Sequence, residues 1–424
     1  MKRIILIHSF FVCLSQFLIA QSDIKLSKDS LHLDIDFIYS KICEIHPDPF
    51  MRFSFDAFTQ LKDSINNSVN ENETIGTFYF KAASLISSIK DGHTTMLMPS
   101  FPASKNLRYG NNIFPLDIKI IENKVYAVFD HFYKDSISGE IVSINNISLD
   151  SLMKPIFNAN SFDKYPDINY KSIEGDFLIL LNELHGSDSI YKIELKGMPK
   201  THVTHGISFD NLMKQNRYVS TNHNPYKLST NNNTVISQFE NFIPNDKLHN
   251  FIDSLFQIVI SESIDTLIID VRGNKGGSSN IISTIISHLT LEKFKIYNQV
   301  QIKISTSVKE RFEKKDTVLS SKIFEMENSS IYNMELEYIE EQKENIFNGK
   351  LIVLTDRSTY SAGSTFAHLI ENMELGEVFG ETGCDDIYFG EFVFLSLPYT
   401  NLNFTISTKK LYEWRSENPK KSRN

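Results

Sequence analysis

Three short segments of the sequence carry groups that could do chemistry together. They are residues 91–94 (DGHT) with His93, a glycine-rich turn over 270–277 (DVRGNKGG), and residues 358–363 (STYSAG) with Ser361. A histidine titrates near neutral pH and suits general-base catalysis, and a serine beside such a base can act as a nucleophile. Backbone amides in a glycine-rich turn or at a helix start can stabilise an oxyanion. The three segments therefore suggest acyl transfer.

Each segment also has a plainer interpretation when it is taken alone. His93 could be an ordinary solvated histidine in a turn, Ser361 could be a helix N-cap, and the glycines could be a tight connection. The turn lacks the Walker pattern because Lys275 precedes its last two glycines, and the three-glycine spacing of a dinucleotide site is absent. Tyr360 and Thr359 before Ser361 also differ from the Gly-x-Ser-x-Gly elbow of α/β-hydrolases.

The elements that must position these groups alternate between strand and helix in the second half of the chain. Apolar runs over 234–239, 266–271 and 351–355 predict strands, and the last two are typical of strands buried on both faces. Amphipathic segments over 248–256, 278–289 and 361–373 predict helices. This alternation favours an α/β layer with right-handed crossovers. Residues 291–347 are charged and irregular and are predicted to run over the surface.

The first half of the chain has a different organisation. Helical spacing predicts helices over 33–45, which ends before Pro47, over 54–65 with a Ser54 cap, and over 74–89 with a Thr74 cap. Alternating segments over 114–120, 125–129 and 139–145 predict strands, with a short helix over 148–157. The stretch from there to about 232 is polar and poorly patterned. Its His202 and His205 could be a metal pair, but no further ligand has convincing spacing, so surface histidines are favoured.

Composition and the N-terminus limit the class of protein. The chain has 424 residues, 41% hydrophobic content and a net charge of −9, which indicates a globular protein of two or three domains and argues against phosphate-neutralising nucleic-acid binding. Residues 1–20 resemble a signal peptide, with Lys2 and Arg3, an apolar run over 4–19 and cleavage after Ala20. Because of this signal peptide we expect an exported protein, secreted or periplasmic. No later run is long enough to span a membrane.

The order of the motifs resembles peptidase family S41, which contains the tail-specific (C-terminal processing) and tricorn-type serine proteases. The resemblance rests on DGHT, a strand ending in DxRxNxGG, VLTDRSTYSAG, and GETG at 380–383, and it covers nearly all of the chain after residue 20. It implies an α/β fold with a ClpP/crotonase-like catalytic core over 233–424. It also implies a helical region over 21–104 that carries DGHT, and a β-rich, PDZ-like module and connection over 105–232.

The resemblance also assigns roles to residues. Ser361 matches the nucleophile, and the amides of Ala362 and of Gly276 or Gly277 match the oxyanion hole. Tail-specific proteases use a lysine about 25 residues after the serine, but residues 383–390 (GCDDIYFG) contain none. The chain therefore looks closer to the Ser-His branch, in which His93 would be the base.

That branch also uses a downstream acid to orient the histidine. Glu413 and Glu417 are the remaining candidates for this acid, and neither matches a motif well.

The expected function is therefore that of an exported serine-type endopeptidase acting on peptides or unfolded proteins, without a metal or cofactor. One alternative is a catalytically weak or inactive peptide-binding protein with the same fold, because the orienting acid is not evident. Another is an acyl-CoA enzyme of the crotonase type, which the signal peptide disfavours. The pair of Ser361 with His93 favours the peptidase.

Overall fold

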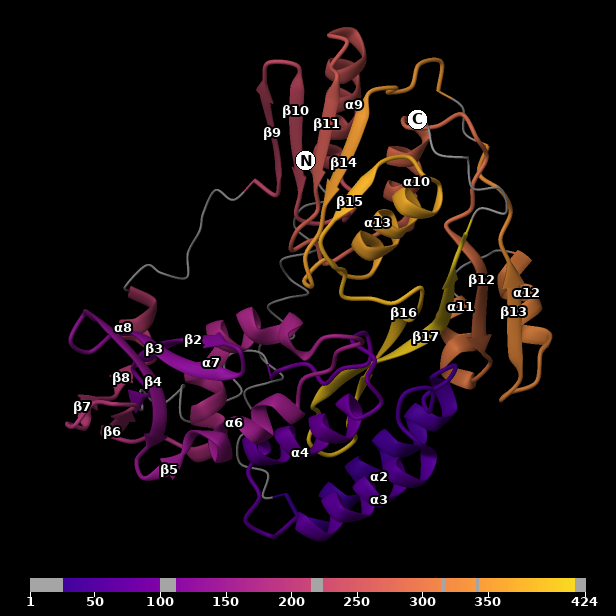
Figure 1. Cartoon of the computed structure of the whole chain (residues 1–424). Helices are drawn as coiled ribbons and strands as arrows, with labels where there is room; N and C mark the ends of the chain where they lie inside the picture. The colour runs from indigo at the N-terminus through magenta and orange to yellow at the C-terminus, as the bar shows by residue number, and fades with distance from the viewer. Residues whose placement is uncertain (1–25, 100–111, 215–223, 314–317, 341–342, 416–424) are drawn as a thin grey trace, which may run out of the picture.

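The computed structural model describes residues 26–99, 112–214, 224–313, 318–340 and 343–415 (Figure 1). The predicted signal peptide and Glu417 lie outside these residues. The chain forms a helical N-terminal layer, a small β-rich module, and a larger region with a five-stranded and a four-stranded sheet. This mixed α/β architecture agrees with the predicted fold class. Among the described helices, none is both long enough and apolar enough to cross a membrane.

Three N-terminal helices lead to the DGHT turn. They are α2 (Lys28–Ile45), α3 (Phe55–Ser68) and α4 (Ile75–Ser87). The predicted caps are confirmed, because the Ser54 and Thr74 hydroxyls accept hydrogen bonds from backbone amides in the first turns of α3 and α4. Such caps stabilise a helix by about 1 kcal/mol. Most residues of α4 are buried, so packing fixes the direction in which the chain enters the turn.

The β-rich module is a mainly antiparallel sheet with helices against it (Figure 1). Its strands are β2 (Leu116–Ile121), β3 (Lys124–Asp130), β4 (Asp135–Ile144), β5 (Ile147–Ser148), β6 (Ile190–Leu195) and β7 (His202–His205). Its helices are α6 (Leu149–Asn158), the 3₁₀ helix η2 (Pro166–Asn169) and α7 (Tyr170–His185). Nearby, β1 (Asn112–Ile113) pairs with β8 (Ile207–Ser208), which precedes α8 (Phe209–Lys214). The likeness to a PDZ module stays a prediction.

Helix α7 corrects the view that the stretch to 232 is poorly patterned. It buries Ile173, Phe177, Leu180 and Leu181 on one face. These positions follow helical spacing, so the signal was present but diluted by the polar residues around it. His202 is paired with an acid, because its Nε2 atom lies 2.8 Å from an Asp130 carboxylate oxygen.

The five-stranded sheet has the order β15-β14-β11-β10-β9, and all its strands except β9 are parallel. The strands are β9 (Tyr226–Asn231), β10 (Thr234–Phe239), β11 (Thr266–Asp270), β14 (Lys350–Leu354) and β15 (Glu377–Phe379). Helices α9 (Asp246–Ser261), α10 (Ser279–Ser287) and α13 (Ala362–Asn372) pack into the same core. The predicted β-α alternation is confirmed here, with Leu267, Ile269 and Val353 fully buried.

The four-stranded antiparallel sheet corrects the expectation for residues 291–347. It has the order β13-β12-β17-β16, with β12 (Tyr297–Lys303), β13 (Ile331–Glu335), β16 (Ile387–Ser396) and β17 (Asn403–Glu413). Helices α11 (Thr306–Glu313) and α12 (Val318–Glu325) connect β12 to β13. Only one face of β12 is buried, through Val300 and Ile302, so its other residues are polar and hide the strand in the sequence.

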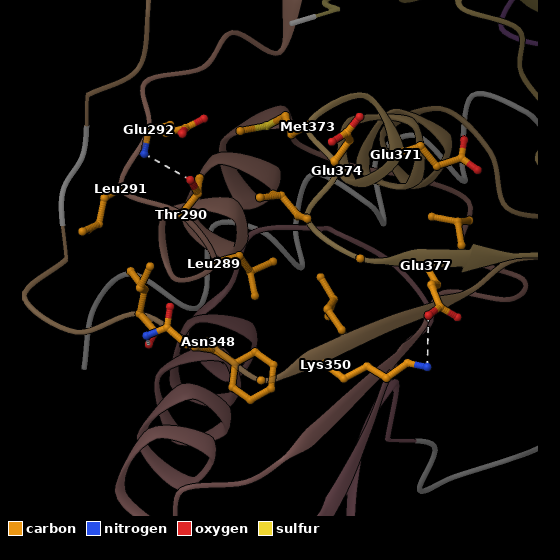
Figure 2. Close-up of a pocket in the computed structure, with 17 residues that line it drawn as sticks. Leu289, Thr290, Leu291, Glu292, Asn348, Lys350, Glu371, Met373, Glu374 and Glu377 are labelled. Atoms are coloured by element: carbon orange, nitrogen blue, oxygen red, sulfur yellow. Dashed lines mark hydrogen bonds and ion pairs between the residues drawn. The ribbon is translucent and has the colours of Figure 1, made fainter. Parts of the chain in front are cut away.

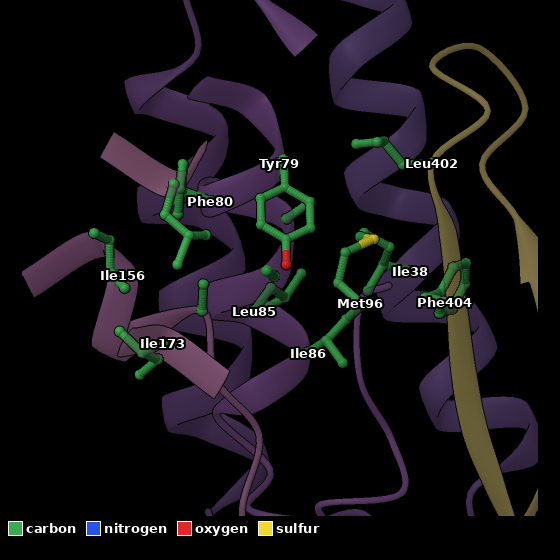
Figure 3. Close-up of a cluster of buried hydrophobic side chains, with 14 of the residues drawn as sticks. Ile38, Tyr79, Phe80, Leu85, Ile86, Met96, Ile156, Ile173, Leu402 and Phe404 are labelled. Carbon is green, nitrogen blue, oxygen red and sulfur yellow. The ribbon is translucent and has the colours of Figure 1, made fainter. Parts of the chain in front are cut away.

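The chain after the DGHT turn pairs with the first half of β17, which lies 308 residues further along the sequence. Met96 pairs with Phe404 in an antiparallel bridge, and the Leu97 amide donates to the Asn403 carbonyl at 2.8 Å. Figure 3 shows Met96 and Phe404 within the apolar cluster formed by the N-terminal helices. Because Ile86 of α4 lies in the same cluster, packing ties the β16–β17 hairpin to the helical layer.

Candidate active site

Ser361 lies in the turn between β14 and α13 with a backbone conformation that serine rarely adopts. Its φ is 54° and its ψ is −128°, and its hydroxyl makes no capping hydrogen bond to α13. Ser361 therefore occupies the N-cap position of α13, but its side chain does not cap the helix. A non-glycine residue in such a region costs on the order of 1–3 kcal/mol, and strain of this kind often accompanies function.

Parallel pairing explains why the glycine-rich turn lies against Ser361. β11 and β14 are neighbours, with Asp270 opposite Leu354, so the turns after both strands emerge at the same edge of the sheet. The Tyr360 amide donates to the Asn274 carbonyl at 2.8 Å, and the Thr359 hydroxyl donates to the Val271 carbonyl at 2.8 Å. These two hydrogen bonds join the turn after β11 to the turn after β14.

The structure brings His93 to Ser361 across 268 residues of sequence. The His93 Nε2 atom lies 3.1 Å from the Ser361 Oγ atom, which is a hydrogen-bond distance. The histidine is held from behind by β17, because the Thr405 hydroxyl donates to the His93 carbonyl at 2.8 Å. The pair has the geometry that a general base and a nucleophile require.

Two backbone amides next to Ser361 could receive an oxyanion. The Ala362 amide, at the start of α13, and the Gly277 amide have no hydrogen-bond acceptor within the described parts of the chain. The Gly276 amide is already used, because it donates to Asn274 Oδ1 at 2.8 Å. Gly276 instead provides close packing, since a Cβ there would lie 2.7 Å from the Ser361 Cβ.

A buried polar network lies behind His93. The Tyr360 hydroxyl is 3.1 Å from His93 Nδ1 and also donates to Asp163, which is 5% exposed. Asp163 further accepts from Arg52 Nη1 at 2.9 Å and from the Gly92 amide at 3.2 Å. Burial, together with the charge of Asp91, raises the pKa of Asp163.

Asp91, the first residue of DGHT, fixes the turn. It is fully buried and accepts from the His93 amide, the Thr94 hydroxyl and the His46 ring at 2.9, 2.5 and 3.1 Å. Burial disfavours its charge, but the hydrogen bond from His46 and the charges of His46 and His93 outweigh this and hold the pKa of Asp91 below its usual value. Asp91 therefore shapes the turn that presents the His93 ring.

The comparisons with known proteins concern the family and the fold. The profile of peptidase family S41 matches residues 235–408, a segment that includes Ser361 and the glycine-rich turn. Residues 235–408 belong to peptidase family S41. His93 precedes this segment. No curated protein sequence matches the chain.

Two solved structures of CPAF, with TM-scores above 0.5, share the fold, and a third solved structure is more distantly similar. The crystal structure of mature CPAF is 11% identical, with a TM-score of 0.58, and the match covers 91% of this chain and 89% of that one. The complex of mature CPAF with lactacystin is 12% identical, with a TM-score of 0.57, covering 92% and 91%. The photosystem II D1 C-terminal processing protease is 12% identical, with a TM-score of 0.42, covering 90% and 88%.

Cys384 occupies the turn in which tail-specific S41 proteases would carry a lysine. It follows Gly383 and is fully buried, and its Sγ atom accepts a hydrogen bond from the Ser361 amide at 3.2 Å. Burial, reinforced by the charge of Asp163, raises the pKa of Cys384 well above its usual value. The residue is therefore a neutral thiol that supports the Ser361 backbone, and it cannot serve as the base.

Glu413 does not orient His93, contrary to one of the two expectations for the acid. Its carboxylate accepts from Thr365 Oγ1 at 2.8 Å and lies 2.6 Å from His368 Nδ1. The other candidate, Glu417, lies outside the described residues. Glu413 therefore joins the end of β17 to α13, and the group that contacts His93 Nδ1 is Tyr360. Sequence reasoning missed this contact, although Tyr360 directly precedes Ser361.

The larger cavity of the S41 region lies away from Ser361. Figure 2 shows this cavity, of about 830 Å³, between the ends of α10 and α13 and the starts of β14 and β15. Because Ser361 is at the opposite end of the 11-residue helix α13, the two are separated by roughly 16 Å. A smaller cavity of about 410 Å³ is lined by Arg52, His368 and Cys384, and so adjoins the Ser361 turn.

Proposed function

We propose that the chain is an exported serine-type endopeptidase in which Ser361 is the nucleophile and His93 the general base. The observation that carries the proposal is the 3.1 Å contact between His93 Nε2 and Ser361 Oγ, beside two amides without acceptors in the described residues. A backbone strained at the serine and an S41 sequence profile around it give further support.

The reaction follows from these positions. Ser361 Oγ bonds to the carbonyl carbon of a peptide while its proton passes to His93 Nε2. The carbonyl oxygen gains negative charge, which the Ala362 and Gly277 amides stabilise; one such donor is worth about 10²–10³ in rate. His93 then gives the proton to the departing amine, and water, activated by His93, releases the acyl group from Ser361.

The substrate is proposed to be a peptide or an unfolded protein segment. A peptide must reach the turn after β14 in an extended form, because Ser361 attacks a backbone carbonyl. The residues of the chain itself supply base, nucleophile and oxyanion donors, so the proposed reaction needs no cofactor.

Export is part of the proposal. It rests on the basic residues Lys2 and Arg3, the apolar run over 4–19 and the small residue Ala20. Expression of the full chain in a bacterium, followed by N-terminal sequencing of the periplasmic product, tests it. A product beginning at Gln21 is expected, and a product retained in the cytoplasm with residues 1–20 attached would contradict export.

The test of catalysis is covalent labelling of Ser361 by a fluorophosphonate, together with hydrolysis of unstructured peptides. Wild-type protein should be labelled at Ser361, and Ser361→Ala should be neither labelled nor active. Ser358→Ala is the matched control, because it removes a hydroxyl from the same turn and should retain labelling.

The alternative is a peptide-binding protein without activity. The observation that favours it is the position of Glu413, which leaves His93 without a direct carboxylate partner on Nδ1. Under this alternative, the wild-type protein would bind unstructured peptides but remain unlabelled.

A further inference from the structure

We propose that Tyr360 and Asp163 are the positioning residues of His93, taking the place of a downstream acid. This inference rests on the proposed function, because it concerns the same histidine. The orienting carboxylate then lies in the connection between α6 and η2, distant in sequence from the C-terminal strands. The phenol of Tyr360 lies between that carboxylate and the imidazole of His93.

The hydrogen bonds form a series in which each group donates to the next, from Ser361 toward Asp163. If Ser361 donates to His93 Nε2, the ring proton must be on Nδ1. Nδ1 lies 3.1 Å from the Tyr360 hydroxyl oxygen, which can accept a hydrogen bond from the Nδ1–H group, and the Tyr360 hydroxyl donates a hydrogen bond to Asp163. The carboxylate of Asp163 only accepts, as the Arg52 and Gly92 donors around it also require.

Other acids near His93 are engaged elsewhere. Asp91 Oδ1 is 3.9 Å from His93 Nδ1, beyond hydrogen-bond distance, and it accepts the His93 backbone amide instead. Glu413 is bonded to Thr365 and His368. Within the described residues, Tyr360 is therefore the side chain that can fix the tautomer of His93.

The glycine of DGHT gives an independent reason. A Cβ at Gly92 would overlap the Tyr360 hydroxyl oxygen and would lie 3.1 Å from Asp163 Oδ2. The turn thus needs a residue without a side chain to let the phenol reach between His93 and the carboxylate. With a larger residue at position 92, the contact between His93 and Tyr360 and the hydrogen bond from the residue 92 amide to Asp163 could not both keep this geometry.

The chemistry of the phenol suits this role. Burial, followed by the negative charge of Asp163, raises the pKa of Tyr360 well above its usual value, so the phenol stays neutral. A neutral phenol passes on the orienting effect of Asp163 without taking the proton from His93. When His93 becomes positively charged during the reaction, Asp163 stabilises that charge through Tyr360.

The experiment compares Tyr360→Phe and Asp163→Asn with wild type by two measurements. The first is the rate of fluorophosphonate labelling at Ser361. The second is the nitrogen NMR signature of the His93 ring, assigned by its loss in His93→Gln. The control is Tyr165→Phe, because Tyr165 lies two residues after Asp163 and its hydroxyl donates to Glu381. Thermal unfolding checks that each variant is folded.

We expect labelling to be about 10- to 100-fold slower in both variants, and unchanged in the control. The His93 signal should move from the Nδ1–H tautomer in wild type toward a mixture in Tyr360→Phe. Wild-type labelling and an unchanged tautomer in both variants would overturn the inference while leaving the peptidase intact. A wild type that is not labelled would overturn the proposed function, and the tautomer measurement would still decide the role of Tyr360.

Discussion

The close approach of Gly276 to Ser361 predicts that Gly276→Ala abolishes most of the activity. A Cβ at this position would lie 2.7 Å from the Ser361 Cβ, 2.9 Å from the Ala362 amide nitrogen and 3.0 Å from the Tyr360 carbonyl oxygen. All three are backbone or near-backbone atoms of the turn that carries Ser361, so none can rotate away. The φ of Gly276 is +91°, which L-residues also avoid.

The size of the effect follows from these distances. Carbon atoms in contact prefer a separation of about 3.5–4 Å, so the turn that carries Ser361 must shift by about 1 Å. A misplacement of about 1 Å costs about 100-fold in rate, or about 2.7 kcal/mol in transition-state free energy. The positive φ adds about 1–2 kcal/mol of destabilisation to the folded state.

The matched control is Gly273→Ala in the same turn. Gly273 has a φ of +76°, but a Cβ there would meet nothing within 4 Å. Both variants should therefore lose stability from backbone strain, as measured by urea unfolding, and Gly276→Ala should lose more because of the overlap. Only Gly276→Ala should slow fluorophosphonate labelling about 100-fold. Equal labelling rates for the two folded variants would refute the reasoning from close packing.

Two further predictions concern groups that tie the site to the rest of the fold. Asp34 of α2 is fully buried and accepts from the Tyr399 and Thr400 amides and the Thr400 hydroxyl, so Asp34→Ala leaves donors unsatisfied. Asp34→Ala should lower the free energy of unfolding in urea by about 1–3 kcal/mol, whereas Asp36→Ala, at an exposed position, should lower it by less than about 1 kcal/mol. A smaller loss for Asp34→Ala than for Asp36→Ala would contradict this. For His368, burial lowers the pKa, but the hydrogen bond and charge of Glu413 outweigh it and raise the pKa. The stability from this pair is then fully present below about pH 6.5 and is lost as pH rises through the raised pKa. Thermal midpoints between pH 5.5 and 9 should show this fall in wild type and a flatter profile in Glu413→Gln, and identical profiles would count against it.

Local pattern allowed the supporting strands to be predicted, whereas Ser361 and His93 were indicated as candidates by the order of the motifs. Apolar runs over 266–271 and 351–355 indicate strands buried on both faces, and glycine marks the turns. Ser361 follows the second of these strands and His93 follows a helix, and the resemblance to family S41 supplied their proposed roles. Their 3.1 Å contact was not available from local pattern, since it depends on the pairing of the chain after His93 with β17.

What sequence reasoning missed has a common physical reason. Asp163 follows a short helix in a connection without periodicity, and its partners Arg52, Gly92 and Tyr360 are distant in sequence. Glu413 was considered an orienting acid from its place in the chain, but β17 directs its carboxylate toward α13. Strand β12 was missed because half of its residues face away from the core and are polar.

The site lies where two hydrophobic cores meet, and this determines how its geometry is maintained. Tyr360 packs against the core that contains the N-terminal helices and β17, whereas Ala362 belongs to the core of the five-stranded sheet. Ser361 stands between them, with His93 held by the first core and the glycine-rich turn by the second. A relative shift of the two cores therefore changes the distance from His93 to Ser361 directly. The hydrogen bonds from β17 to the His93 segment and from Tyr360 to Asn274 oppose that shift, so the reactive geometry depends on contacts that are remote from the reacting atoms.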